Sequence, residues 1–298
     1  MDKIIEISNL TKHYGETVAV NEVEFSVPGG EIFGYLGPNG AGKTTTIRMI
    51  MNFLKPTSGE IRVFGMDPSK EYPQIHKRIG YMNSDMKLYE HLTGNEMLLF
   101  LSNLREGVYK DNVERLSQKL DIDLSLQIRN LSRGNKQKIA LIQAFMHRPE
   151  LIILDEPSTG LDPLMQQQFN EIVKQSVSDG STVFLSSHIL PEVEALCDRV
   201  AIIKDGFLIT EERVDVLKKN SVQKFEIIFS VNPPENIFQQ VQGISNISID
   251  DRVVTCSLVG AIDPLIKEAA NFDVEAFKSF ETDLEDIFLS YYKGSERK

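Results

Sequence analysis

The sequence contains no tryptophan, only two cysteines and no long apolar run. Cys197 and Cys256 lie far apart and lack the spacing of metal ligands, so we expect two reduced thiols in a cytosolic protein. The longest apolar stretches, such as LIILD and VAIIK, have the length of strands, whereas a membrane-spanning helix needs about 20 residues. The first residues, MDKIIEISNL, contain no apolar signal core. If the protein acts at a membrane, another chain is expected to supply the spans.

Positive charge is also scarce. The chain has 32 Lys and Arg residues against 43 Asp and Glu residues, and its formal net charge is -11. Because nucleic-acid-binding domains usually carry a basic face, this balance weighs against DNA or RNA, and we expect no nucleic-acid partner. The 298 residues, 41% of them hydrophobic, suffice for one large domain or two smaller ones with an ample core.

The order of apolar segments predicts an α/β protein in two parts. Residues 1–220 begin with alternating strands and continue with apolar strands between helices, which is typical of a parallel sheet. Amphipathic helices at about 85–145 read as an insertion. Residues 221–298 predict a small α+β module with strands, a helix at ENIFQQVQ (235–242), and a closing helix at DLEDIFLSYY (283–292). Apolar residues of the closing helix, Leu284, Ile287 and Phe288, are expected to pack on the body or on a second copy.

A glycine-rich loop follows an apolar strand and precedes a helix. It matches the pattern G-x-x-x-x-G-K-[ST], in which backbone N–H groups and the helix N-terminus hold phosphates. Lys43 supplies a cation for the β- and γ-phosphates, and the Thr44 hydroxyl is suited to bind Mg²⁺. The loop alone is compatible with kinases, GTPases and ATPases. Its residues are Gly37, Pro38, Asn39, Gly40, Ala41, Gly42, Lys43 and Thr44.

Two carboxylates end the apolar strand LIILDEP. Asp155 is placed to hold Mg²⁺ through water. Because successive strand side chains point to opposite faces, we expect Glu156 to point away from Asp155 and to act as general base toward the attacking water. His188 ends a further apolar strand, TVFLSSH. Since open α/β sheets bind ligands at the carboxyl ends of their strands, we expect His188 to contact the γ-phosphate.

The ordered motifs of the first 220 residues resemble the ATP-binding subunits of ABC transporters. LSRGNKQ at 131–137 resembles the signature motif of that family, STGLD at 158–162 its D-loop, and SSH at 186–188 its switch-histidine strand. Tyr14 resembles the aromatic residue that stacks on adenine. The resemblance implies an α/β P-loop NTPase core with an antiparallel β subdomain and a helical insertion. It also implies ATP and Mg²⁺ as cofactors, with Thr45 as a further nucleotide contact.

The resemblance further implies a shared catalytic site. Two subunits would face head to tail, with each ATP held between the phosphate loop of one and Ser132 and Gly134 of the other. Lys43, Glu156 and His188 would be the catalytic residues, and ATP would close the dimer. Ser132 is also suited to be a helix N-cap, and both roles are compatible because an N-cap serine is aimed at the helix N-terminus.

The sequence departs from the family pattern at two motifs. The signature has Arg133 and Asn135 where the family usually has Gly and Gln, a form that resembles the subgroup driving type-2 exporters of drugs, antibiotic peptides, lipids or glycans. The Q-loop has Ser84 where the family has Gln or Glu. Ser84 is a poor substitute for that Mg²⁺ contact, and Asp85 is the other candidate.

The expected partners are a separate transmembrane permease subunit and a second copy of this chain or a paralogue, at the cytoplasmic side of the cell membrane. Residues 85–145 are expected to grip the permease. One alternative is a soluble ABC-type switch acting on a cytosolic partner, although such proteins usually carry two motif sets. Another is an importer ATPase, whose signature is usually closer to LSGGQ. DNA-repair ATPases need a long coiled coil, and the sequence has no sustained heptads.

Overall fold

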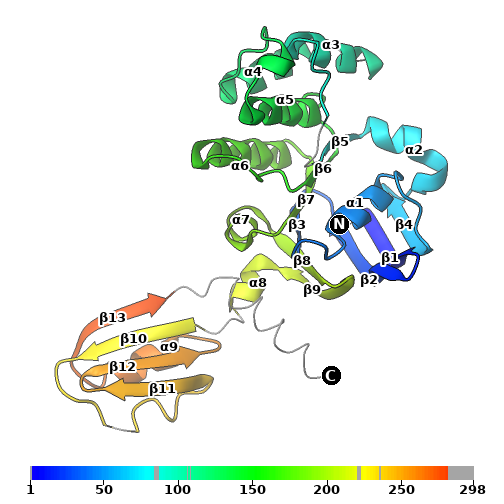
Figure 1. The fold of residues 1–298 in the computed structure, drawn as a ribbon. Helices are drawn as coiled ribbons and strands as arrows, with labels where there is room; N and C mark the ends of the chain where they lie inside the picture. The colour runs from blue at the N-terminus through cyan, green and yellow to red at the C-terminus, as the bar shows by residue number, and fades with distance from the viewer. Residues whose placement is uncertain are drawn as a thin grey trace. The chain divides into compact units, whose positions relative to one another are not determined.

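The computed structural model describes residues 2–83, 87–105, 107, 109–219, 223–234 and 236–280. The chain divides into two compact units, Met1–Glu211 and Glu212–Lys298 (Figure 1). Within the described residues, no helix is both long and apolar enough to cross a lipid bilayer.

The first unit is built on a six-stranded sheet with the order β5-β6-β7-β3-β8-β9. The pairs β5–β6, β6–β7, β7–β3 and β3–β8 are parallel, so their carboxyl ends share one edge of the sheet. All residues of β3, β6 and β7 are buried, which explains why these strands are largely apolar. The strands are β3 (Ile32–Leu36), β5 (Ile79–Met82), β6 (Leu151–Asp155), β7 (Thr182–Ser187), β8 (Arg199–Lys204) and β9 (Phe207–Arg213).

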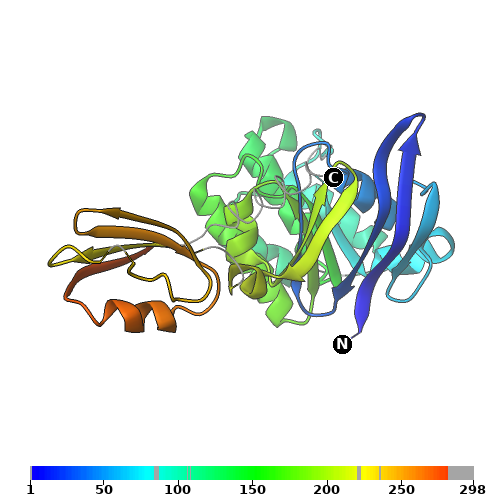
Figure 2. The same ribbon diagram turned by 90° about the horizontal axis from the view of Figure 1, so that it is seen from below.

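A second, antiparallel sheet has the order β2-β1-β4 and forms the outer layer on one side of this unit (Figure 2). Its strands are β1 (Lys3–Tyr14), β2 (Thr17–Pro28) and β4 (Ser58–Val63). Helix α1 (Lys43–Ile50) lies between the two sheets, and its Ile47 and Ile50 belong to their common core. Phe25 of β2 stacks on Phe33 and Phe184 of the large sheet at ring-centroid distances of 5.6 and 6.1 Å. The packing therefore fixes α1 and the loop before it.

Helices cover the other face of the large sheet, where α6 (Pro163–Ser178) and α7 (Leu190–Leu196) lie (Figure 1). Helix α2 (Pro68–Lys77), which the sequence analysis did not predict, connects β4 to β5. It contains Pro68 and Pro73 and is kinked at Glu71, and a proline inside a segment argues against a helix when the sequence is read alone.

The predicted helical insertion is present as one group of helices. It consists of α3 (Gly94–Leu104), α4 (Lys110–Lys119), the short 3₁₀ helix η1 (Ile128–Asn130) and α5 (Arg133–Phe145). A capping box fixes the start of α3, because Thr93 accepts from Glu96 N and Glu96 accepts from Thr93 N. The insertion returns to the large sheet through α5, which packs against β5.

The second unit is a four-stranded antiparallel sheet with the order β11-β12-β10-β13, whose core is closed by α9. It follows α8 (Val214–Lys219). Its elements are β10 (Gln223–Phe229), β11 (Ile244–Asp250), β12 (Val253–Leu258), α9 (Asp263–Ala269) and β13 (Val274–Phe280). The predicted closing helix at 283–292, with Leu284, Ile287 and Phe288, lies outside the described residues.

The helix predicted at 235–242 is wrong. Residues 236–240 form turns, in which Val241 N donates to Phe238 O and Gln239 N donates to Asn236 O. Phe238 has φ 66, a left-handed conformation that interrupts a right-handed helix. Ile237 and Phe238 are nevertheless buried, so the apolar spacing reflects packing against the sheet and not helical periodicity.

Candidate active site

The loop between β3 and α1 leaves no room for side chains at two of its glycines. A Cβ at Gly37 would lie 2.3 Å from Ile203 O, and one at Gly42 would lie 2.4 Å from Ala19 O. Gly42 also has φ 106, in the left-handed region that favours glycine. The main chain is therefore pressed against β2 and β8, and it opens α1 with free N–H groups, an arrangement suited to hold anions.

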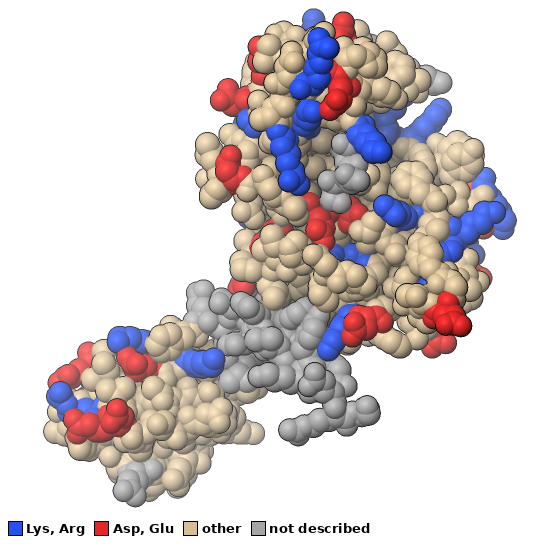
Figure 3. Space-filling view, viewed as in Figure 1, with Lys and Arg blue, Asp and Glu red and all other residues tan. Residues whose placement is uncertain are grey.

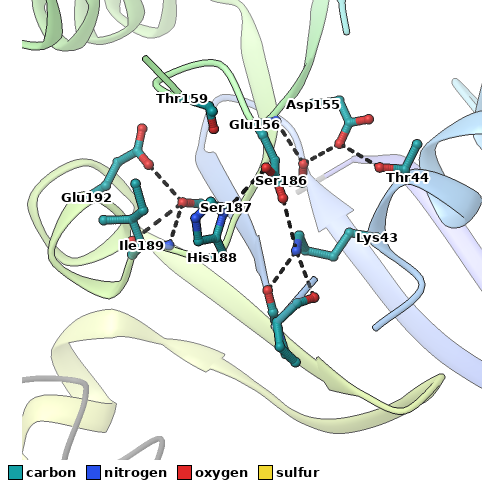
Figure 4. A network of polar contacts seen from close by, with 12 residues as sticks. Lys43, Thr44, Asp155, Glu156, Thr159, Ser186, Ser187, His188, Ile189 and Glu192 are labelled. Atoms are coloured by element: carbon teal, nitrogen blue, oxygen red, sulfur yellow. Dashed lines mark hydrogen bonds and ion pairs between the residues drawn. The ribbon is translucent and has the colours of Figure 1, made fainter. Parts of the chain in front are cut away.

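Lys43 is buried at the N-terminus of α1, with 4% of its surface exposed. Its Nζ donates to Gly37 O at 2.7 Å and to Pro38 O at 3.0 Å, and it forms an ion pair with Glu156 Oε1 at 3.2 Å (Figure 4). A buried cation surrounded by oxygen atoms at a helix N-terminus has the chemistry of a phosphate-binding lysine. The loop tip, with Asn39 and Gly40, is exposed.

Asp155 and Thr44 provide hard oxygen ligands at one point. Thr44 Oγ1 donates to Asp155 Oδ1 at 3.2 Å, and Ser186 Oγ donates to the same oxygen at 2.6 Å (Figure 4). The other oxygen, Asp155 Oδ2, is buried and has no hydrogen-bond partner. Among the described residues, no group of three His, Cys, Asp or Glu side chains could bind a metal by itself. One carboxylate and one hydroxyl beside a phosphate site fit Mg²⁺, which commonly completes its coordination with phosphate and water oxygens.

Glu156 lies outside the strand, contrary to the expectation that strand alternation would separate it from Asp155. Strand β6 ends at Asp155, and Glu156 has φ 50. Its N–H donates to Ser186 Oγ at 3.0 Å and to Ser186 O at 3.2 Å, so β7 holds this left-handed residue in place. The left-handed turn, and not the pleat of a strand, directs the Glu156 carboxylate.

His188 directly follows β7 and faces Glu156. Its Nδ1 lies 3.4 Å from Glu156 Oε2, while the other carboxylate oxygen contacts Lys43 (Figure 4). One carboxylate therefore joins the lysine of the phosphate loop to the histidine of β7. The structure brings together Lys43, Thr44, Asp155, Glu156 and His188.

The remaining predicted residues lie on other elements. Ser132 is exposed and is the N-cap of α5, where its Oγ accepts from Asn135 N at 3.2 Å. Gly134 lies in the first turn of the same helix. Tyr14 ends β1 with 48% of its surface exposed, and Lys12 Nζ lies 5.4 Å from its ring centroid. Thr45 follows Thr44 in α1, and Ser84 and Asp85 lie outside the described residues.

The sequence analysis assigned no role to several contributing residues. Ser186 holds both Asp155 and Glu156, and Gln137 Nε2 of α5 donates to Pro157 O at 2.7 Å, which ties the signature segment to the loop after β6. Ser187 Oγ donates to the buried Glu192 Oε2 at 2.8 Å. Gln137 lies in the LSRGNKQ motif, and Ser186 and Ser187 lie in the SSH motif, which was the available signal. The pairing of Ser186 with Asp155 is visible only in the sheet. Hydroxyl and amide side chains of this kind are too common to be identified by type alone.

The fold and this site define a P-loop nucleoside triphosphatase. Residues 20–159 match the model of the ABC transporter family. The chain is 38% identical over 224 residues to the bacitracin transport ATP-binding protein BcrA of Enterococcus faecalis, covering 74% of this chain and 73% of that protein. It is 38% identical over 211 residues to the linearmycin resistance ATP-binding protein LnrL of Bacillus subtilis, covering 69% and 68%.

Solved structures agree with these sequence relatives. An ATP-binding subunit of an ABC transporter superimposes with a TM-score of 0.67 at 30% identity, covering 72% of this chain and 92% of that chain. The chain belongs to the ATP-binding subunits of ABC transporters. It binds nucleotide and is an ATP hydrolase, and the predicted fold class is confirmed.

Proposed function

We propose that this chain powers an ABC exporter for a drug, antibiotic peptide, lipid or glycan. The observation that carries the direction of transport is the pair of relatives at 38% identity whose names specify bacitracin transport and linearmycin resistance. The RGNKQ form of the signature supports the same subgroup. We assign the ATPase domain to residues 1–220 and an accessory or dimerisation module to residues 221–298.

Nucleotide binding is assigned to the loop before α1 and to Tyr14. Backbone N–H groups of the loop and the Lys43 ammonium would hold the phosphates, and the exposed Tyr14 ring would stack on adenine. Thr44 and Asp155 would hold Mg²⁺, which supplies charge neutralisation at the β- and γ-phosphates. The unpartnered Asp155 Oδ2 is the atom that this assignment satisfies.

Hydrolysis is assigned to Glu156 and His188. Glu156 accepts a proton from the attacking water while the water oxygen forms a bond to the γ-phosphorus. The bond from that phosphorus to the bridging oxygen of ADP breaks. His188 contacts the γ-phosphate from the adjacent strand end. The 3.4 Å contact between His188 Nδ1 and Glu156 Oε2 supports this pairing, because it holds both side chains at one place.

Ser132 and Gly134 are assigned to the ATP of a second copy. Ser132 is exposed at the start of α5, and the helix N-terminus there is suited to an anion. Arg133 supports the assignment, because it adds a cation to this helix N-terminus. The Arg133 side chain lies close to Gly160, in the loop between β6 and α6. The guanidinium carbon is 3.8 Å from the position that a Cβ on Gly160 would occupy.

A transmembrane permease is the proposed membrane partner, with this chain at the cytoplasmic side. Helix α3 exposes 63% of Leu99 and 65% of Leu104, large fractions for apolar side chains, and Phe100 packs edge-on against exposed Tyr89. Lys and Arg side chains, with acidic side chains among them, lie over the inserted helices at the top of the view in Figure 3. An apolar surface with a charged surround suits a protein partner.

The proposal is tested by identifying the reading frames that neighbour this chain's and co-expressing the chain with a membrane protein encoded there. We expect the two to co-purify and to lower cellular accumulation of an exported antibiotic. The Leu99→Asp variant should lose the complex while retaining ATP binding, and Lys119→Ala, at a half-buried lysine of α4, is the control. Raised accumulation that depends on ATPase activity would indicate import and would contradict the export proposal, as would a chain that binds ribosomes and no membrane protein.

A further inference from the structure

Glu192 is an acid buried beside the catalytic cluster. It lies in the first turn of α7, and only 2% of its surface is exposed. Oε2 accepts from Ser187 Oγ at 2.8 Å, and Oε1 is buried without a hydrogen-bond partner. A buried carboxyl group with one oxygen unpaired is destabilising, because burial removes it from water. Such a group therefore calls for an explanation.

The Ser187 hydroxyl relays this contact to the turn that carries His188. Its oxygen accepts from Ile189 N at 3.0 Å while its hydrogen goes to Glu192 (Figure 4). Residues 187 and 189, on both sides of His188, are thereby fixed by one hydroxyl. The arrangement resembles a capping box in which the serine stands between the first N–H and the glutamate.

Glu96 occupies the equivalent place in α3 but in a different environment. It accepts directly from Thr93 N at 2.8 Å, is exposed, and has no catalytic residue near it. A glutamate that caps a helix N-terminus therefore does not need to be buried. Glu192 differs because it is buried, and the charges of His188 and Glu156 act on it.

We propose that Glu192 is a positioning residue for hydrolysis, which holds Ser187 and the His188 turn so that His188 stays against Glu156. The inference rests on the proposed roles of Glu156 and His188. It adds a side chain from α7, the helix that follows β7, to the groups that set the geometry of the site.

The surroundings of Glu192 favour its neutral, protonated form over a wider pH range than for an exposed glutamate. Burial raises its pKa, and the Glu156 carboxylate adds to the rise, while the hydroxyls of Ser158 and Ser187 and the charge of His188 lower it in part. The other titratable group at this place, Cys197, is itself buried, and its pKa is raised by burial and by Glu192 and Asp198. In its neutral form, Glu192 adds no second negative charge near Glu156.

The sign of the pH dependence follows from the raised pKa. Below the folded-state pKa, Glu192 is protonated and the site is intact. As pH rises through that pKa, the group ionises beside Glu156, and turnover falls. The unfolded chain releases this proton at the ordinary pKa of 4.5. Folding stability therefore also decreases from about that pH up to the folded-state pKa and is level above it.

The test compares Glu192→Gln, Glu192→Ala and Ser187→Ala in the purified full chain, by ATP turnover from about pH 5.5 to about pH 9. Glu192→Gln should retain kcat and lose the alkaline decline, so that its kcat relative to the unmodified chain rises with pH. Glu192→Ala should lower kcat about tenfold with little change in KM, because positioning for chemistry is lost. Ser187→Ala should reproduce that loss of kcat. The double variant Glu192→Ala/Ser187→Ala should have a kcat no lower than that of either single variant.

Two outcomes would overturn the inference. One is Glu192→Gln being as impaired as Glu192→Ala at every pH, and the other is Glu192→Ala with unchanged kcat. If Glu192→Ala does not fold, Glu192→Gln and Ser187→Ala still decide. Glu96→Ala is the control for loss of a helix cap, and its pH profile should match that of the unmodified chain. If Glu156→Gln is inactive but the Glu192 variants turn over ATP like the unmodified chain, only this inference is refuted. If Glu156→Gln is active, the proposed catalytic site itself is refuted.

Discussion

At the scale of residues, Glu156 is the junction of the site. One carboxylate oxygen contacts Lys43 at 3.2 Å and the other contacts His188 at 3.4 Å. Ser186 anchors its backbone from β7. Each group in this cluster is held by at least one other, so loss of one side chain should disturb both phosphate binding and proton transfer.

Lys43→Ala is expected to lower ATP turnover at least about 100-fold, because it removes a cation directed at the transferred phosphate. ATP affinity, measured by calorimetry, should fall as well. Lys70→Ala is the matched control, since Lys70 is 78% exposed and pairs with Asp67 on the surface. Normal turnover by Lys43→Ala would contradict the assignment of the phosphate loop.

At the scale of elements, the carboxyl ends of β3, β6 and β7 bring the loop, the carboxylates and the histidine to one edge. This follows from their parallel pairing in neighbouring positions of the sheet. The loop itself depends on close packing against β2 and β8, which only glycine permits at Gly37 and Gly42.

Gly42→Ala should destabilise the chain by about 2 kcal/mol or more and abolish ATP binding, because its Cβ meets Ala19 O and its φ of 106 is strained for alanine. Thermal unfolding with and without ATP measures both effects. Gly134→Ala is the control for stability, since a Cβ there meets no atom within 4 Å. Equal unfolding temperatures for the two variants would show that the loop is less constrained than its contacts indicate.

Elements with a regular apolar period could be predicted from the sequence, and irregular ones could not. The strand, loop and helix around Lys43 followed from pattern and motif. Helix α2 was missed because of its prolines and kink, and 235–242 was predicted helical although Phe238 is left-handed. For the same reason, the pairing of Asp155 with Ser186 and the turn at Glu156 required coordinates, because they depend on strand order and a single unusual φ.

At the scale of the whole molecule, the phosphate loop and the signature helix belong to different parts of the first unit. Helix α5 stands with the inserted helices, whereas α1 lies between the two sheets (Figure 1). Gln137 connects α5 to the loop after β6, so the signature segment is linked within one chain to the loop that follows the proposed catalytic carboxylates. A site completed by a second copy would thereby couple two nucleotides.

The central claim is that two copies share each catalytic site, and mixing two inactive variants tests it most directly. Lys43→Ala and Ser132→Arg should each be inactive alone, because each disables both sites of a homodimer. Their equimolar mixture should recover up to about a quarter of the unmodified rate, since half of the dimers are mixed and each has one intact site.

The control replaces the Lys43→Ala chain in the mixture by a chain carrying both substitutions, which leaves no intact site in any dimer. The account predicts recovery of ATP turnover in the first mixture and none in the control. A first mixture that stays inactive, or full turnover by Ser132→Arg alone, would contradict the shared site.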